Sequence, residues 1–163
     1  MLRARHTRRG GFSLLELVIV VVIIGILAAI AIPRMSRGTA GAADSALAGD
    51  LAVLRNAVEL FAAEHDGKAP KLASIAAQLT QYTDSSNTSA PVATKDKDHP
   101  YGPYIRKIPK LPVGSNKNLD TFTATMPLGT DAAGWYYNEA TPEVRANLAD
   151  SEVDVTEKPY NAY

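Results

Sequence analysis

Glu16 is the residue whose position most strongly suggests a chemical role. It lies near the start of an apolar run from Phe12 to Ile32, in which Ser13 is the only other polar residue. This run of 21 residues would form a helix about 31 Å long, which matches the roughly 30 Å hydrocarbon core of a bilayer. A carboxylate inside a membrane costs on the order of 3 kcal/mol, so an intramembrane acid is a functional hypothesis by default. We therefore expect Glu16 to have a specific partner.

The residues before the apolar run indicate its orientation in a membrane. Residues 1–11 contain four arginines and no acid, whereas Arg34 and Arg37 are the nearest cations on the other side of the run. Because positive charge is retained in the cytoplasm, this balance places the amino terminus there and the chain after Pro33 on the opposite side.

The order Gly11-Phe12-Ser13-Leu14-Leu15-Glu16-Leu17 after a short basic leader closely resembles the type IV pilin and pseudopilin family. The resemblance implies that a prepilin peptidase cuts between Gly11 and Phe12 and that Phe12 becomes N-methylated. Glu16 then matches the family's glutamate at the fifth mature position, and Pro33 matches its helix-kinking proline. A kink is also expected at Gly25. The implied location is the inner membrane with a periplasmic head, then a periplasm-spanning filament.

The implied cleavage gives Glu16 a partner. A new α-amine at Phe12 has a pKa near ~8 and remains basic after N-methylation. Glu16 lies four residues further, on the same helix face. Our hypothesis is that Glu16 pairs with the Phe12 amine of another subunit and sets the register of assembly.

Other chemistry finds little support in the sequence. The chain has no cysteine, and its three histidines, at positions 6, 65 and 99, are scattered. No Ser/His/Asp arrangement or glycine-rich phosphate loop is present. We therefore expect that the protein is not an enzyme and that it has no cofactor apart from the structural calcium ion considered next. Removing residues 1–11 leaves 13 Lys and Arg against 17 Asp and Glu, so nucleic acid is not an expected partner.

A structural calcium ion is the one metal that we consider. Major pseudopilins often bind calcium in their C-terminal loops, and calcium prefers several carboxylate and carbonyl oxygens. The candidate ligands are acids of the last third of the chain: Asp120, Asp131, Asp150 and Asp154. Their spacing matches no known calcium loop, and a solvated acidic surface is the alternative.

The predicted fold is α+β, with a long amino-terminal helix packed on a small antiparallel sheet. Five apolar residues recur at spacings of 4, 3, 4 and 3 and form one stripe along a helix: Leu47, Leu51, Leu54, Val58 and Phe61. We expect this stripe to pack against the sheet. We expect this helix to end at His65-Asp66-Gly67, with Gly67 in a left-handed conformation. Residues 71–82 predict a short second helix, and residues 83–99 an exposed loop.

The last third of the chain predicts strands at residues 119–126, 134–138 and 144–148, followed by a tail of low order at 150–163. The proline-rich residues 101–114 resemble a segment of type II secretion major pseudopilins, although the family's Asp-Pro-Trp-Gly ending is replaced by Leu111-Pro112-Val113-Gly114. A wrapping loop and a recognition surface are equally compatible with this segment.

These patterns divide the chain into four expected parts: a leader (1–11), a transmembrane and assembly helix (12–33), the amphipathic half of the long helix (34–66) and a globular head (67–163). We interpret the chain as a structural subunit of a helical pilus-like filament, most similar to the major pseudopilin of type II secretion. Its expected partners are copies of itself, the prepilin peptidase, minor pseudopilins, and an inner-membrane assembly platform with its cytoplasmic ATPase.

Three alternatives remain. The first is a type IV pilin for adhesion, twitching or DNA uptake, which the amino-terminal motif does not separate from a pseudopilin. The second is a single-span anchored periplasmic binding protein, against which Glu16 argues. The third is a secreted protein whose signal is cleaved near Ile32, after the small residues Ala28, Ala29 and Ala31.

Overall fold

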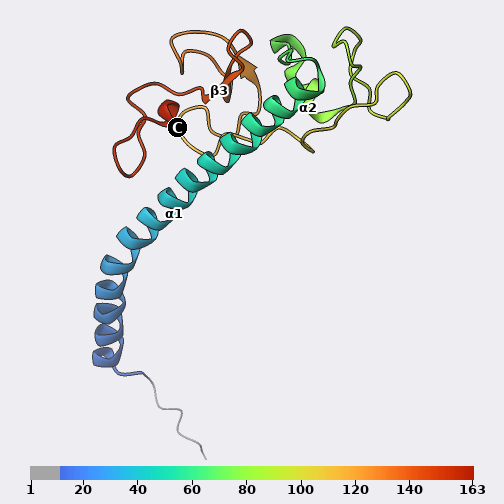
Figure 1. The fold of residues 1–163 in the computed structure, drawn as a ribbon. Helices are drawn as coiled ribbons and strands as arrows, with labels where there is room; N and C mark the ends of the chain where they lie inside the picture. Colours follow the sequence, from blue (N-terminus) through green and yellow to red (C-terminus); the bar gives the residue numbers. More distant parts are fainter. Residues whose placement is uncertain (1–11) are drawn as a thin grey trace, which may run out of the picture. The chain divides into compact units, whose positions relative to one another are not determined.

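A computed structural model describes residues 12–163, apart from the side chains of residues 32–37. The chain divides into two compact units, residues 1–39 and 40–163. Helix α1 (Leu14–Glu64) begins in the first unit and ends in the second (Figure 1). The second unit adds η1 (Leu72–Ser74), α2 (Ile75–Thr80), β1 (Phe122–Thr123), β2 (Trp135–Asn138), β3 (Glu143–Ala146) and η2 (Tyr160–Ala162). The α+β class predicted from the sequence is confirmed.

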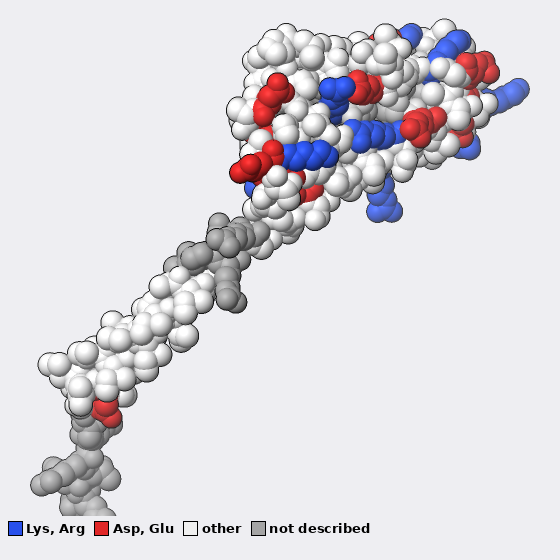
Figure 2. All heavy atoms as spheres, turned by 60° about the vertical axis from the view of Figure 1, so that its left-hand side comes forward, with Lys and Arg blue, Asp and Glu red and all other residues white. Residues whose placement is uncertain are grey.

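The first unit contains a helical segment, Leu14–Ala31, that is long and apolar enough to cross a membrane. Its large apolar side chains are exposed, as a lipid-facing helix requires. Figure 2 shows this segment as white apart from one acidic side chain, and Glu16 is the only charged residue of the segment. The kinks expected at Gly25 and Pro33 stay predictions, and the side chain of Pro33 lies outside the described residues.

The second half of α1 forms one wall of the head's core. All five residues of the predicted stripe, from Leu47 to Phe61, are buried and pack with residues of β2 and β3. The helix ends as expected, because the N–H of Gly67 donates to the carbonyl of Ala62 at 2.8 Å. Asp66 takes the first left-handed position, with φ 54°, and Gly67 the second, with φ 77°.

The sheet is mixed, with strand order β1-β2-β3. The predicted antiparallel pairing is correct for β2 and β3, where Trp135 pairs with Ala146. It is wrong for β1, which runs parallel to β2. The first strand is also much shorter than predicted. Its ladder ends early because the Thr123 hydroxyl accepts a hydrogen bond from the Thr125 N–H at 3.0 Å, and Pro127 has no N–H to donate.

The C-terminal residues 150–163 are ordered, which corrects the prediction of a loose tail. Tyr160 and Tyr163 pack against the core, and Figure 1 shows this segment, in red, beside α1. The buried carboxylate of Asp44 accepts hydrogen bonds from the Tyr160 hydroxyl at 3.0 Å and from the Val155 N–H at 3.3 Å. Both donors lie more than 100 positions after Asp44 in the sequence, so no local pattern could reveal these bonds.

Arg55 ties the same segment to the edge of the sheet. Its guanidinium donates to the carbonyl of Val144 at 3.0 and 3.2 Å and to a main-chain oxygen of Tyr163 at 2.6 Å. Because β3 is an edge strand, its outward carbonyls need partners other than a further strand. Arg55 therefore protects this edge and anchors the C-terminal segment on α1.

Replacing Tyr160 by Phe should destabilise the head by about 1–2 kcal/mol, since the buried Asp44 carboxylate loses one of its donors. Burial, together with the bond to Asp44, raises the pKa of Tyr160 to about 12, so the phenol is a donor at neutral pH. Urea unfolding followed through the fluorescence of Trp135, the only tryptophan, measures the change. Tyr136→Phe is the matched control, because no described residue accepts a hydrogen bond from its hydroxyl. Equal stability of the two variants would contradict this role.

Candidate functional site

The start of α1 holds a reciprocal hydrogen-bonded cap built from Ser13 and Glu16. The Ser13 N–H donates to Oε2 of Glu16 at 2.9 Å, and the Leu15 N–H donates to Oγ of Ser13 at 3.3 Å. Because α1 begins at Leu14, Ser13 is the N-cap and Glu16 is the third helical residue, as in a capping box. The Ser-x-x-Glu spacing signals this motif in the sequence, but our sequence analysis did not identify it.

The cap satisfies backbone donors where they would otherwise be costly. The first N–H groups of a helix have no partner within the helix, and in lipid there is no water to replace one. A carboxylate also interacts favourably with the positive end of the helix dipole. The local fold therefore lowers the cost of placing Glu16 in an apolar helix.

The cap uses only part of the hydrogen-bonding capacity of Glu16. Within the described residues, Oε1 of Glu16 has no hydrogen-bond partner. The side chain borders an open apolar hollow of about 420 Å³, together with Phe12, Leu17, Ile19 and Val20. Phe12 is 91% exposed. Glu16 therefore combines a carboxylate oxygen that has no hydrogen-bond partner among the described residues with a position beside apolar surface.

The predicted cleavage site is only partly described. Phe12, Ser13 and Glu16 belong to the described chain, whereas Gly11 and the leader lie outside it. The structure therefore brings together Ser13 and Glu16, a pairing that the sequence analysis missed. The peptidase cut between Gly11 and Phe12 stays a prediction.

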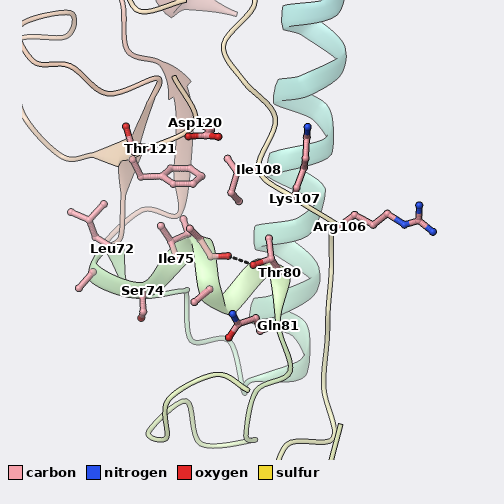
Figure 3. A pocket seen from close by; sticks show the side chains of 14 residues that line it. Leu72, Ser74, Ile75, Thr80, Gln81, Arg106, Lys107, Ile108, Asp120 and Thr121 are labelled. Carbon is pink, nitrogen blue, oxygen red and sulfur yellow. Dashed lines mark hydrogen bonds between the residues drawn. The ribbon is translucent and has the colours of Figure 1, made fainter. Parts of the chain in front are cut away.

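The proline-rich segment 101–114 both wraps the core and borders a surface groove. Ile108, Leu111 and Val113 are buried, and the indole N–H of Trp135 donates to the Pro109 carbonyl at 2.9 Å. A groove of about 690 Å³ lies between α2, the start of β1 and residues 106–108. In Figure 3 its apolar wall includes Leu72, Ile75 and Ile108, while Arg106 extends away from it. The wrapping role of this segment is thus established by its contacts.

His65 is a core residue. Its ring stacks on Phe61 with centroids 3.8 Å apart. Its Nδ1 lies 2.7 Å from the Phe61 carbonyl oxygen, and its Nε2 lies 3.1 Å from Oγ1 of Thr83. Both ring nitrogens therefore have structural partners.

The four acids considered for calcium do not form one cluster. Among residues 12–163, no group of three or more His, Asp or Glu side chains is arranged to hold a metal ion. Asp131, Asp150 and Asp154 each accept hydrogen bonds from protein donors, and Asp120 lines the surface groove. The hydroxyl of Thr123 holds the pKa of Asp131 below its usual range, with the Asn147 amide as a further cause.

The capping box predicts a local effect on backbone protection. In the full chain embedded in micelles, Ser13→Ala should speed amide hydrogen exchange at Leu15 about fivefold, because a lost N-cap bond costs about 1 kcal/mol. Exchange measured by nuclear magnetic resonance reports this residue directly. Ser45→Ala is the control, since the Ser45 hydroxyl bonds to the Gly41 carbonyl within the helix at 2.9 Å and caps nothing. Unchanged exchange at Leu15 would show that Ser13 does not cap α1.

Comparison with known proteins identifies a matching family model and relatives that span about two thirds of the chain. Residues 6–32 match the family described as the prokaryotic N-terminal methylation motif. The chain is 31% identical over 113 residues to type II secretion system core protein G of Klebsiella pneumoniae, covering 69% of this chain and 74% of that protein. It is 28% identical over 109 residues to the protein of the same name from Vibrio cholerae, covering 67% and 68%.

A further relative comes from a different system. The chain is 47% identical over 62 residues to fimbrial protein Q of Moraxella bovis, with 38% of each chain covered. No solved structure gives a significant match. The two relatives that span about two thirds of this chain are both named type II secretion system core protein G, whereas the fimbrial protein covers a shorter part of it.

Proposed function

The chain belongs to the family of type II secretion system core protein G, and we propose that it is the major pseudopilin of such a system, a structural subunit that polymerises into a helical filament. In this proposal a prepilin peptidase removes residues 1–11 and Phe12 is N-methylated. The monomer waits in the inner membrane as a single span, with the head in the periplasm. An assembly platform, a cytoplasmic ATPase and minor pseudopilins are its partners.

The observation that carries the proposal is the partly satisfied carboxylate of Glu16 in an otherwise apolar helix. One carboxylate oxygen accepts from the Ser13 N–H, and the other has no hydrogen-bond partner among the described residues. The side chain borders the apolar hollow beside Phe12 and Leu17. A charge in this position is expensive unless it meets an opposite charge. Cleavage before Phe12 supplies one, because a free α-amine is protonated below a pH of about 8.

Pairing between copies leads to a filament. If Glu16 of one subunit meets the Phe12 amine of the next, the contact joins two different surfaces. Contacts of this head-to-tail kind extend without limit unless the rotation between copies closes a ring. The exposed apolar side chains of Leu14–Ala31 would then exchange lipid for the helices of neighbouring subunits.

A type IV pilin is the second candidate function. The identity with fimbrial protein Q favours it, although it covers only 38% of the chain. Long extracellular pili produced without overexpression would support this alternative. The wider coverage of the core protein G relatives favours the pseudopilin.

Two substitutions at position 16 separate the cap from the charge. Glu16→Gln keeps an oxygen that can accept from the Ser13 N–H, since Gln also serves in capping boxes, but it removes the charge. We expect normal membrane insertion and at least about a tenfold loss of sheared filaments, equivalent to about 1.4 kcal/mol per contact. Glu16→Ala should lose both the cap and assembly.

Filament yield from cells that express the complete secretion system, normalised to membrane-inserted subunit, measures both variants. Glu157→Gln is the control, because it removes an exposed acid of the head whose carboxylate has no hydrogen-bond partner among the described residues. Wild-type filament yield from Glu16→Gln would refute the role of the charge.

A further inference from the structure

A buried amide, Asn147, connects the loops that follow β1 and β3. Its Nδ2 donates to Oδ1 of Asp131 at 2.7 Å and to the Ala133 carbonyl at 2.9 Å, and its Oδ1 accepts from the Gly129 N–H at 2.7 Å. Asn147 is fully buried. Both hydrogens of its amide and its oxygen are therefore engaged with protein partners.

The same node extends to two further segments. The hydroxyl of Thr123 donates to Oδ2 of Asp131 at 2.6 Å, so each oxygen of that carboxylate has a protein donor. The amide of Asn116 donates to the main-chain carbonyls of Asp131 at 3.0 Å and Asn147 at 2.7 Å. Four separate parts of the chain are thus held together by hydrogen bonds between protein groups alone.

The backbone at this node also leaves no room for a side chain. Gly129 has φ 77°, and a Cβ atom there would lie 2.5 Å from the backbone nitrogen of Ala149. Glycine is required for the Gly129 N–H to reach Asn147 in this conformation.

The groups that contact the Asp131 carboxylate are hydrogen-bond donors, which do not coordinate a cation. Calcium is bound by six to eight oxygen atoms, whereas N–H and O–H groups point their hydrogens at the carboxylate of Asp131. Asp154 is used in the same way: its Oδ1 accepts from the N–H and hydroxyl of Thr156 at 2.7 Å each and from the Lys158 N–H at 3.0 Å, and its Oδ2 accepts from the Tyr163 hydroxyl. Asp150 accepts from the Asn161 amide at 2.7 Å.

We infer that the hydrogen-bond node of Asn147, Asp131, Thr123 and Asn116 takes the place of a structural calcium ion, and that the head folds and stays folded without calcium. Three of the four acids considered as calcium ligands, Asp131, Asp150 and Asp154, are instead acceptors for the protein's own donors. This inference concerns the stability of residues 40–163 and is independent of whether the chain assembles into a filament.

Thermal unfolding of the full chain in detergent micelles tests the inference directly. Trp135 is fully buried and lies two residues after Ala133, whose carbonyl accepts from Asn147. Its fluorescence therefore reports on this part of the head. Protein stripped of metal and kept in excess chelator should unfold at the same Tm as protein with millimolar calcium. A calcium site filled at about 100 times its Kd would instead raise the Tm by about 10 °C, and that result would overturn the inference.

A substitution locates the stabilisation. Asn147→Ala should lower the Tm by the same amount in chelator and in calcium, because the lost bonds involve protein groups only. Asn56→Ala is the matched control: Asn56 is exposed on α1, and its side-chain amide has no hydrogen-bond partner among the described residues. If Asn147→Ala leaves the Tm unchanged, or if calcium restores the Tm of this variant to the wild-type value, the node does not have the role assigned to it.

Discussion

One charged side chain in an apolar helix is the constraint on which the rest of the account depends. Glu16 is the only charge between Phe12 and Ala31, and the membrane makes an unpaired charge costly. The capping box with Ser13 lowers this cost within one chain, but it leaves a carboxylate oxygen beside apolar surface. In the proposed filament, a free amine at Phe12 of a second copy would complete the pairing, which is why a local hydrogen bond bears on assembly.

The head meets a different constraint, because it has no cysteine to close its long C-terminal segment. Side chains from α1 perform that closure. Asp44 accepts from Tyr160, and Arg55 donates to both Val144 and Tyr163. Together with the node at Asn147, these bonds hold a sheet of only three short strands. Polar contacts between distant segments therefore supplement the apolar core formed by α1 and the sheet.

Features with a local signal were predictable from the sequence, and features that depend on distant partners were not. The helical stripe from Leu47 to Phe61 and the strands around Trp135 and Val144 follow from spacing and residue type. The parallel pairing of β1 and the order of residues 150–163 depend on contacts across the fold, so alternation and composition could not reveal them. The capping box is an exception to this division. Its signal is local, because Ser13 and Glu16 lie within four residues, yet the motif was not among the predictions.

The amino-terminal residue and intact mass of the purified mature protein test the central claim most directly. The protein should be prepared from cells with and without the prepilin peptidase. The account predicts a chain that starts at Phe12 and carries one added methyl group, and it predicts that this form disappears without the peptidase. A chain that retains Met1 in both strains would contradict the account, because Glu16 would then have no Phe12 amine to pair with. A chain that starts near Ile32 would also contradict it, because Glu16 itself would be removed.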